Sequence, residues 1–269
     1  MAPAQRRLSG ALYSESSGDG AGDATPVVLL HGWGMNLRVF DGVRAALAGE
    51  HRVTAVDLPG HGRSAWNPQT TAQDWLADLA ALLPRGATLL GWSLGGQLAL
   101  QLASQPALAV RRLVLVATSP RFVQAPDWPH GLPAATLRAF AAQLQRDPER
   151  TVADFLDLQV RGSADADAVR ATLQQTLRQH GAAHPQALRA GLALLEHNDL
   201  RALARSVDVP ALLVAGQYDR VTPPQAAAAL AQLMPQAQLL QIARAGHAPF
   251  LSHPAPLSAA LLDFTRVAP

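Results

Sequence analysis

The sequence predicts an α/β fold, with a mostly parallel sheet, helices on both of its faces and a helical lid inserted between two strands. The first observation behind this prediction is that short apolar runs alternate with segments of helical periodicity along the 269-residue chain, as in a series of βαβ units. The second is a long stretch before Pro210 without any strand-like run. The apolar runs predict strands near residues 27–30, 53–57, 87–91, 113–117, 210–215 and 237–242.

Polar and helical segments lie between these strands. Residues 14–25 are rich in Gly, Ser and Asp, and they predict a solvated hairpin or loop before the first apolar run. Residues 72–83 repeat apolar side chains at helical spacing, and the alanine-rich residues 226–231 predict a further core helix.

Three apolar stripes at helical spacing follow the fourth predicted strand, with breaks at residues 147–148 and 162–163. The stripes consist of Leu137, Phe140 and Leu144, of Val152, Phe155 and Leu156, and of Val169, Leu173 and Leu177. We therefore expect an α/β core formed by residues 1–120 and 199–269, with a helical lid at residues 121–198.

Composition limits the class of protein. Hydrophobic residues make up 49% of the chain, enough for a large core, and the absence of cysteine excludes disulfides and thiolate metal sites. All 22 basic residues are arginine, against 20 acidic ones, and they are scattered without interleaved aromatic residues, so nucleic-acid binding is not expected. No apolar stretch approaches the length of about 18 residues that a transmembrane helix needs, and residues 1–10 are not followed by the apolar segment of a signal peptide. We expect a cytoplasmic monomer without membrane contact.

A Gly-x-Ser-x-Gly pentapeptide, residues 91–95, directly follows the apolar run at residues 87–90. A strand that ends in this pattern and continues into a helix forms a nucleophile elbow, in which the serine hydroxyl projects above the sheet. Glycine suits the flanking positions because a side chain there would keep the helix from packing closely on the strand. Ser93 is therefore a candidate covalent nucleophile. The alternative is an ordinary strand-to-helix turn.

Two further residues follow predicted strands in the order that this type of hydrolase requires, which is Ser, then Asp or Glu, then His. Asp219 comes after residues 210–215 and His247 after residues 237–242, at strand ends where parallel sheets place their ligands. A histidine takes the proton of the serine, and an acid holds that histidine in the right tautomer. Taken singly, Asp219 could be a turn former and His247 a surface residue. Together with Ser93 they predict a catalytic triad.

The apolar run at residues 27–30 ends in His-Gly-Trp-Gly, a form of the loop that supplies oxyanion donors. We expect the backbone N–H groups of Trp33 and Leu94 to stabilise the oxyanion of a tetrahedral intermediate, where the loss of one donor costs about 3 kcal/mol. We expect the ring of His31 to order this loop without doing chemistry.

Asp57 also follows a predicted strand, but it precedes Ser93 in the chain. We expect Asp57 to bond backbone amides of the following Pro-Gly-His-Gly-Arg-Ser turn, and His61 to be a residue of that turn.

A lid would exclude water and form the walls of an acyl pocket. The aromatic residues that could line such a pocket are Phe122, Trp128, Phe140 and Phe155. We expect Phe140 to be an ordinary packing residue. The indole of Trp33, together with Phe155 and Trp128, is expected to contact the substrate.

Several blocks of the sequence carry a resemblance to a known family. They are residues 31–36, 57–64, 91–96, 119–120 with 127–129, and 246–254. Together they resemble the BioH family, the proteobacterial pimeloyl-[acyl-carrier protein] methyl ester esterases of biotin synthesis, from about residue 27 to residue 262. The Asp-Trp-Pro segment and the His-Ala-Pro-Phe-x-Ser-His-Pro block are the more specific parts of the resemblance.

The resemblance implies an α/β-hydrolase fold and hydrolysis of the methyl ester that caps pimeloyl groups on acyl carrier protein. It also implies that Ser93, Asp219 and His247 form the triad and that Phe155 contacts the acyl chain. Because the carrier is acidic, family members present lid arginines to it. Arg150 occupies one such position, but Asp154 lies where a second arginine is expected.

Other functions share these features. A broad short-chain carboxylesterase acting on small-molecule esters has the same triad. A carbon–carbon bond hydrolase or an acyltransferase shares the core but usually differs in the lid, and a ligand receptor on the same scaffold would retain the triad with negligible turnover. No metal and no organic cofactor is expected for any of them.

Overall fold

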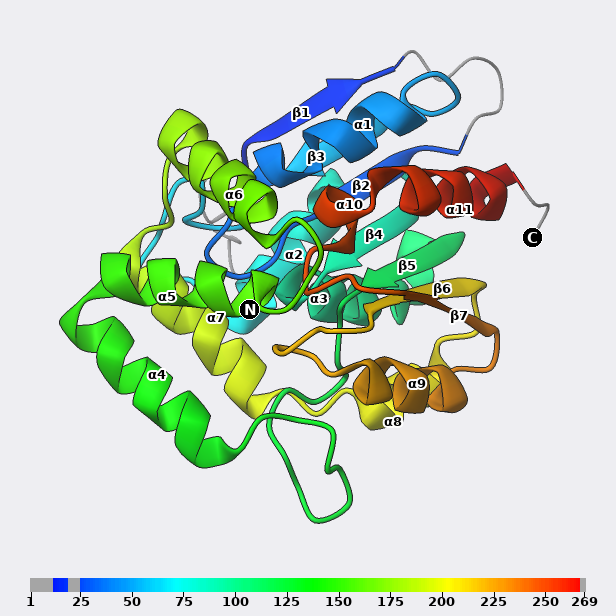
Figure 1. The fold of residues 1–269 in the computed structure, drawn as a ribbon. Helices are drawn as coiled ribbons and strands as arrows, with labels where there is room; N and C mark the ends of the chain where they lie inside the picture. The colour runs from blue at the N-terminus through cyan, green and yellow to red at the C-terminus, as the bar shows by residue number, and fades with distance from the viewer. Residues whose placement is uncertain (1–11, 19–24, 267–269) are drawn as a thin grey trace, which may run out of the picture.

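The computed structural model describes residues 12–18 and 25–266. Its strands form one sheet in the order β1-β3-β2-β4-β5-β6-β7 (Figure 1), in which β1 runs antiparallel to β3 and the other neighbours are parallel. The strands are β1 (Ser14–Ser17), β2 (Val27–Leu30), β3 (Val53–Val56), β4 (Thr88–Trp92), β5 (Arg112–Val116), β6 (Ala211–Gly216) and β7 (Ala237–Ile242). The predicted α/β class and the six predicted strands are confirmed, with ends shifted by no more than one residue.

The expectation of a solvated hairpin or loop at residues 14–25 is wrong for Ser14–Ser17, which form β1 at the edge of the sheet and pair with the distant strand β3. The strand contains no apolar residue, so it has no hydrophobic pattern to reveal it. A side-chain hydrogen bond of 2.8 Å between Ser16 and Thr54 reinforces its pairing with β3. Glu15 forms ion pairs with Arg38 and Arg44, which lie between β2 and β3 in the chain and fix β1 to that segment. Residues 19–24, and the N-terminal segment used to argue against a signal peptide, lie outside the described residues.

From β2 onward, helices and short 3-10 helices lie between successive strands, as expected of βαβ units, and further helices follow β7. They are η1 (Leu37–Phe40), α1 (Asp41–Leu47), α2 (Ala72–Leu82), α3 (Leu94–Ala103), η2 (Pro106–Leu108), α4 (Ala134–Arg146), α5 (Pro148–Val160), α6 (Ala166–His180), α7 (Pro185–His197), α8 (Arg201–Ser206), α9 (Pro224–Leu233), α10 (Pro249–Ser252) and α11 (Pro254–Arg266). None of these helices is both long and apolar enough to cross a bilayer.

Two apolar layers, one on each face of the sheet, hold the core together. Alternate residues of the strands point to opposite faces: Val28 and Leu30 pack in the layer under α2, α3 and α9, whereas Val27 and Leu29 pack in the layer under α1 and α11. Since both faces are covered, the central strands are apolar along most of their length, as is typical of parallel sheets.

Helices α4 to α7 are inserted between β5 and β6 and gather at one end of the sheet (Figure 1). The two predicted breaks are present: Asp147 caps α5 through a hydrogen bond from the Arg150 N–H, and residues 161–165 separate α5 from α6. Contacts of α5, α6 and α7 reach the loops that follow β2, β3 and β7. The insertion therefore lies over the carboxyl ends of the strands.

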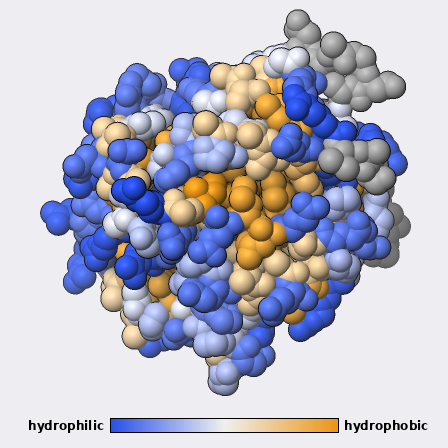
Figure 2. Space-filling model, turned by 45° about the vertical axis from the view of Figure 1, so that its right-hand side comes forward, coloured by the Kyte–Doolittle hydropathy of each residue, from blue (hydrophilic) through white to orange (hydrophobic). Residues whose placement is uncertain are grey.

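Apolar side chains also gather on the face shown in Figure 2, near the free edge of the sheet. A groove of about 760 Å³ runs there between β7 and α11, and Leu239 on its rim is 41% exposed. Residues at the N-terminal ends of β5, β6 and β7 line the groove. It is therefore at the opposite end of the strands from the α4–α7 insertion.

The close approach of α3 to the sheet gives a direct test of the fold. A Cβ on Gly95 would overlap the carbonyl oxygen of Leu30, whereas a Cβ on Gly42 in α1 would meet open space. We expect Gly95→Ala to lower the free energy of unfolding by about 1–3 kcal/mol through overpacking. Gly42→Ala, the matched control, should be neutral or stabilising by up to about 1 kcal/mol. Urea unfolding of both variants measures this, and an unchanged stability of Gly95→Ala would contradict the packing.

Candidate active site

Ser93 occupies a strained turn between β4 and α3. Its backbone has φ 55° and ψ −115°, a region that residues with a Cβ rarely adopt outside functional sites. The backbone is held there because the Ser93 N–H donates to the carbonyl of Val116 at 3.0 Å. The Ser93 hydroxyl makes no capping bond to α3, so the helix does not engage it. This is the geometry of the predicted nucleophile elbow.

Asp219 and His247 form a buried pair. The Nδ1 atom of His247 lies 2.8 Å from Oδ2 of Asp219. Asp219 is itself oriented by the backbone N–H groups of Val221 and Thr222, which donate to Oδ1 at 2.8 and 2.9 Å, and by the Thr222 hydroxyl at 2.8 Å from Oδ2. Since the carboxylate oxygen accepts the Nδ1 proton, the lone pair of the neutral ring is left on Nε2, where a general base needs it.

The ring of His247 lies beside the elbow but is not bonded to the serine. The indole N–H of Trp92, the residue before Ser93, donates to the His247 carbonyl at 2.8 Å, and the two rings are 5.6 Å apart. Nε2 of His247 is buried without a hydrogen-bond partner among the described residues. The structure thus joins Asp219 to His247 directly and places Ser93 close by, without the Ser93–His247 hydrogen bond. Such bonds often tighten only when substrate binds.

The predicted oxyanion donors lie on the elbow and on the loop after β2. Leu94 is the first residue of α3, so its N–H has no acceptor within the helix and lies at the positive end of the helix dipole. Trp33 lies in the loop between β2 and η1, where Gly34 has φ 74°. A second N–H can therefore come from this loop.

His31 holds that loop in place. Its Nε2 accepts the N–H of Leu58 at 3.0 Å, so Nδ1 carries the proton and donates to the carbonyl of Gly32 at 2.8 Å. Burial lowers the pKa of His31 well below its usual range, and the neighbouring His61 lowers it further. The ring is therefore neutral at pH 7 and connects two loops, in agreement with the structural role expected from the sequence.

Aromatic side chains surround a small cavity near the Asp219–His247 pair. Trp33 meets Phe140 and Phe155 edge-on, with ring centroids 5.4 and 5.2 Å apart, and Phe155 lies 6.4 Å from the ring of His247. The cavity has a volume of about 50 Å³. Its walls are Trp33, Phe122, Leu132, Thr136, Leu137, Phe140, Phe155, Leu158, Leu192 and Leu195.

Phe140 and Trp128 differ in their relation to this cavity. The expectation that Phe140 serves only for packing is wrong, because its ring forms part of the cavity wall. Trp128, predicted to contact the substrate, is not among the cavity-lining residues. Its indole donates to the carbonyl of Arg121 at 2.9 Å, and its ring lies under the guanidinium of Arg201. Its role in substrate binding stays a prediction without support from this cavity.

Sequence reasoning missed Gln159, on the last turn of α5. Its backbone carbonyl accepts the N–H of His247 at 2.9 Å, and its side chain is 1% exposed with no partner for either polar atom among the described residues. A buried amide without partners costs about 1–3 kcal/mol, and Gln159 bears on the site through its backbone carbonyl, which holds the N–H of His247. The sequence signal that could have revealed Gln159 is its position, because it continues at helical spacing the apolar stripe of Val152, Phe155 and Leu156.

Arg150, the predicted carrier contact, is exposed near the start of α5. Its guanidinium forms an ion pair of 2.8 Å with Asp154. Hydrogen bonds from Gln143 and Arg150 lower the pKa of Asp154, so Asp154 is charged at neutral pH and offsets part of the positive charge of Arg150. Among the described residues, His, Asp and Glu side chains form no group of three that could hold a metal ion.

Comparisons with known proteins agree with this geometry. The family model described as alpha/beta hydrolase fold matches residues 25–254. The chain is 38% identical over 262 residues to a pimeloyl-[acyl-carrier protein] methyl ester esterase of Nitrosospira multiformis, which covers 95% of this chain and 98% of that protein. A protein of the same name from Chromobacterium violaceum is 43% identical over 243 residues, or 90% of this chain and 93% of its own length. The fold is shared with an esterase (EaEST) from Exiguobacterium antarcticum, with a TM-score of 0.85 at 23% identity over 95% of this chain and 96% of that one.

The buried histidines predict a loss of stability in acid. Burial lowers the pKa of His61 from its ordinary value of 6.5 to about 4. As the pH falls below 6.5, the unfolded chain therefore takes up a proton that the folded protein refuses until about pH 4, and stability decreases across that window. At about 1.4 kcal/mol per pKa unit, His61 accounts for about 3 kcal/mol of this loss.

His61→Asn should remove this contribution, because an amide can replace Nδ1 as the donor to the carbonyl of Pro59 without taking up a proton. Urea unfolding at pH 7 and pH 4.5 measures the difference, with His197→Asn at an exposed position as the control. A loss between the two pH values as large in His61→Asn as in the wild type would contradict this account.

Proposed function

The chain belongs to the α/β-hydrolase fold family and, within it, to the pimeloyl-[acyl-carrier protein] methyl ester esterases, and on that premise we propose that it hydrolyses the methyl ester of pimeloyl groups attached to acyl carrier protein. The observation that carries the chemistry is the buried Asp219–His247 pair beside Ser93 on its strained turn. Relatives that share the substrate-defining name align over nearly the whole chain. The step belongs to biotin synthesis, as the family resemblance implies.

In the acylation step, Oγ of Ser93 attacks the carbonyl carbon of the methyl ester while Nε2 of His247 takes the hydroxyl proton. The N–H groups of Leu94 and Trp33 stabilise the resulting oxyanion. The tetrahedral intermediate collapses, the bond to the methoxy oxygen breaks, and His247 returns its proton to release methanol. Asp219 stabilises the imidazolium throughout.

Deacylation repeats the sequence with water. His247 takes a proton from the water as its oxygen attacks the acyl carbon, and then gives that proton to Oγ of Ser93 as the acyl–oxygen bond breaks. The product is a free carboxyl group at the far end of the pimeloyl chain, which stays attached to its carrier. No cofactor takes part in this proposal.

The apolar cavity suits the methylene chain of the substrate. Trp33, Phe140 and Phe155 offer aromatic surface next to His247. A volume of about 50 Å³ is too small for a pimeloyl chain, however, since sites for small ligands usually measure about 300 Å³ or more. We propose that residues 121–198 act as a lid over a core of residues 1–120 and 199–269, and that the α4–α5 pair moves outward to admit the chain.

The acidic carrier is proposed to dock near Arg150 on this lid. The side chain of Arg150 is 70% exposed, but its ion pair with Asp154 reduces the positive charge that it presents. That pairing favours the second candidate, a broad carboxylesterase acting on small esters, as does the small volume of the cavity. We further propose a cytoplasmic monomer that binds neither nucleic acid nor membranes.

Asp219→Asn tests the triad. An asparagine can hold the ring in the wrong tautomer, an exchange that lowers kcat about 10⁴-fold in the serine protease used as a reference case. We expect a loss of similar size in the hydrolysis of p-nitrophenyl acetate, while Asp208→Asn at an exposed position far from the site keeps wild-type activity. A loss smaller than about tenfold for Asp219→Asn would assign the orienting acid to another residue.

The carrier proposal is tested by kcat/KM for pimeloyl methyl ester, free and attached to acyl carrier protein, with Ser93→Ala as the inactive control. We expect preference for the attached ester, and we expect Arg150→Glu to lower kcat/KM for that ester by about tenfold, as reversal of an interface charge does through the association rate. The free ester should not be affected. Arg85→Glu, exposed at the other end of the sheet, is the matched charge reversal. Equal rates on both esters would favour the broad carboxylesterase instead.

A further inference from the structure

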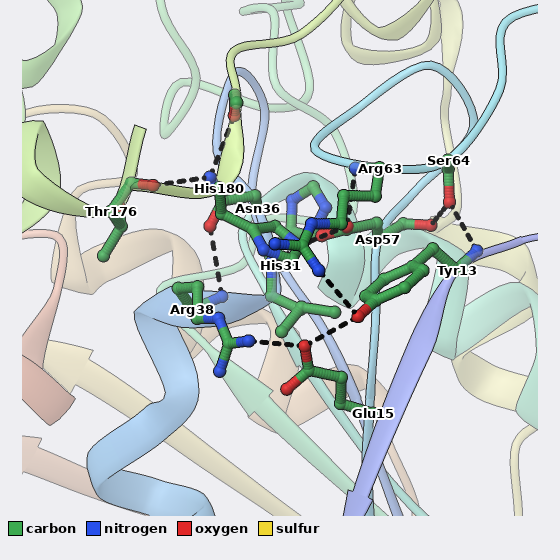
Figure 3. A network of polar contacts seen from close by, with 12 residues as sticks. Tyr13, Glu15, His31, Asn36, Arg38, Asp57, Arg63, Ser64, Thr176 and His180 are labelled. Atoms are coloured by element: carbon green, nitrogen blue, oxygen red, sulfur yellow. Dashed lines mark hydrogen bonds and ion pairs between the residues drawn. The ribbon is translucent and has the colours of Figure 1, made fainter. Parts of the chain in front are cut away.

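A buried polar contact joins the last turn of α6 to the loop after β3 (Figure 3). The Nε2 atom of His180 lies 2.7 Å from Oδ2 of Asp57, and their side chains are 1% and 0% exposed. The ring centroids of Tyr13 and His180 are 5.5 Å apart, with the two rings tilted against each other. His180 lies in the α4–α7 insertion, whereas Asp57 lies in the core, so this bond crosses the boundary between the two.

Asn36 makes a second connection across the same boundary (Figure 3). Its amide nitrogen donates to the carbonyls of Thr176 and Gly181, at 3.1 and 3.0 Å, and its amide oxygen accepts the N–H of Arg38 at 3.1 Å. One buried side chain thus satisfies carbonyls at the end of α6 and caps η1 at the same time. Asn36 lies two residues after Gly34, at the end of the loop that carries Trp33.

Asp57 connects His180 to both sides of the Trp33 loop. Its Oδ1 accepts the N–H of Leu37 at 2.8 Å, and its Oδ2 also accepts the N–H of Arg63 at 2.9 Å. The next residue, Leu58, donates its N–H to His31, which in turn donates to the carbonyl of Gly32. A continuous chain of contacts therefore leads from His180 through Asp57, Leu58 and His31 to the carbonyl of Gly32. This carbonyl belongs to the same peptide group as the N–H of Trp33.

We propose that His180 is a positioning residue for the oxyanion hole. Through its bond to Asp57, the packing of α6 against the core determines the position of the Trp33 N–H. This inference rests on the proposed function, which assigns the oxyanion role to Trp33. A buried carboxylate needs hydrogen-bond donors. The carboxylate of Asp57 has three such contacts, two with backbone N–H groups of the core and one with His180 of the insertion. When α6 moves away from the core, Asp57 loses one hydrogen-bond donor and Asn36 loses two acceptors.

The coupling has a kinetic consequence. Oxyanion donors act on the transition state and leave the binding of the ground state unchanged, so a displaced Trp33 N–H lowers kcat and leaves KM almost unaffected. A residue that only keeps the protein folded would instead lower the concentration of competent enzyme. Active-site titration with a fluorophosphonate counts the competent sites and separates these two cases.

Three variants carry the test, assayed with p-nitrophenyl acetate. His180→Leu removes the donor at similar volume, and His180→Gln keeps an amide N–H at the position of Nε2. Gln186→Leu removes a different contact between insertion and core, the 2.8 Å bond from the indole of Trp66, which does not touch the Trp33 loop.

Per titrated site, we expect His180→Leu to lower kcat by roughly 10- to 100-fold, the cost of misplacing a catalytic group by about an ångström, with KM changed less than about twofold. A trifluoromethyl ketone, whose adduct with serine carries an oxyanion, should bind more weakly by the same factor. His180→Gln and Gln186→Leu should stay within about threefold of the wild type.

Equal kcat per titrated site in His180→Leu and the wild type would overturn the proposal, as would an equal loss in Gln186→Leu. If His180→Leu does not fold, His180→Asn replaces it, because its shorter amide stays polar but does not reach Asp57, and the same comparison decides. Failure of the proposed function looks different: the wild type itself would then lack esterase activity, or Ser93→Ala would retain it.

Discussion

The structure depends on how closely α3 approaches the sheet. A Cβ at Gly91 would overlap the backbone of Gly95, and a Cβ at Gly95 would overlap the carbonyl of Leu30. Because these side chains are absent, α3 lies directly against β2 and β4, and the chain between β4 and α3 must turn through the strained conformation of Ser93. The same approach places the first N–H of α3 beside the loop that leaves β2. The positions of the proposed nucleophile and of the proposed oxyanion donors thus follow from one packing constraint.

The α4–α7 insertion takes part in holding the site as well as covering it. The carbonyl of Gln159 in α5 accepts the N–H of His247, and the carbonyl of Leu188 in α7 accepts the indole N–H of Trp33 at 2.8 Å. With the His180–Asp57 bond, three helices of the insertion each hold a different part of the site. A movement that opens the small cavity must therefore break or bend contacts on which the catalytic geometry depends.

The parts of the site predictable from sequence were those that a local pattern determines. Asp219 and His247 each follow an apolar strand, and parallel strands bring their carboxyl ends to one edge, so their meeting could be foreseen. The strand at Ser14–Ser17 could not, because it has polar side chains and owes its structure to β3. The His180–Asp57 contact joins residues 123 apart in the chain, and only the packing of α6 on the core brings them together. Phe140 was misjudged because a helical stripe does not show which of its members meets a cavity.

The proposed mechanism requires a covalent acyl intermediate at Ser93. The most direct measurement is intact-mass spectrometry of the enzyme after rapid acid quenching during turnover of p-nitrophenyl and methyl esters of pimelic acid, followed by peptide mapping. We expect a mass increase of one acyl group, located on the peptide that contains Ser93 and absent from Ser93→Ala. Full turnover without any acyl adduct, or an adduct on another residue, would contradict it.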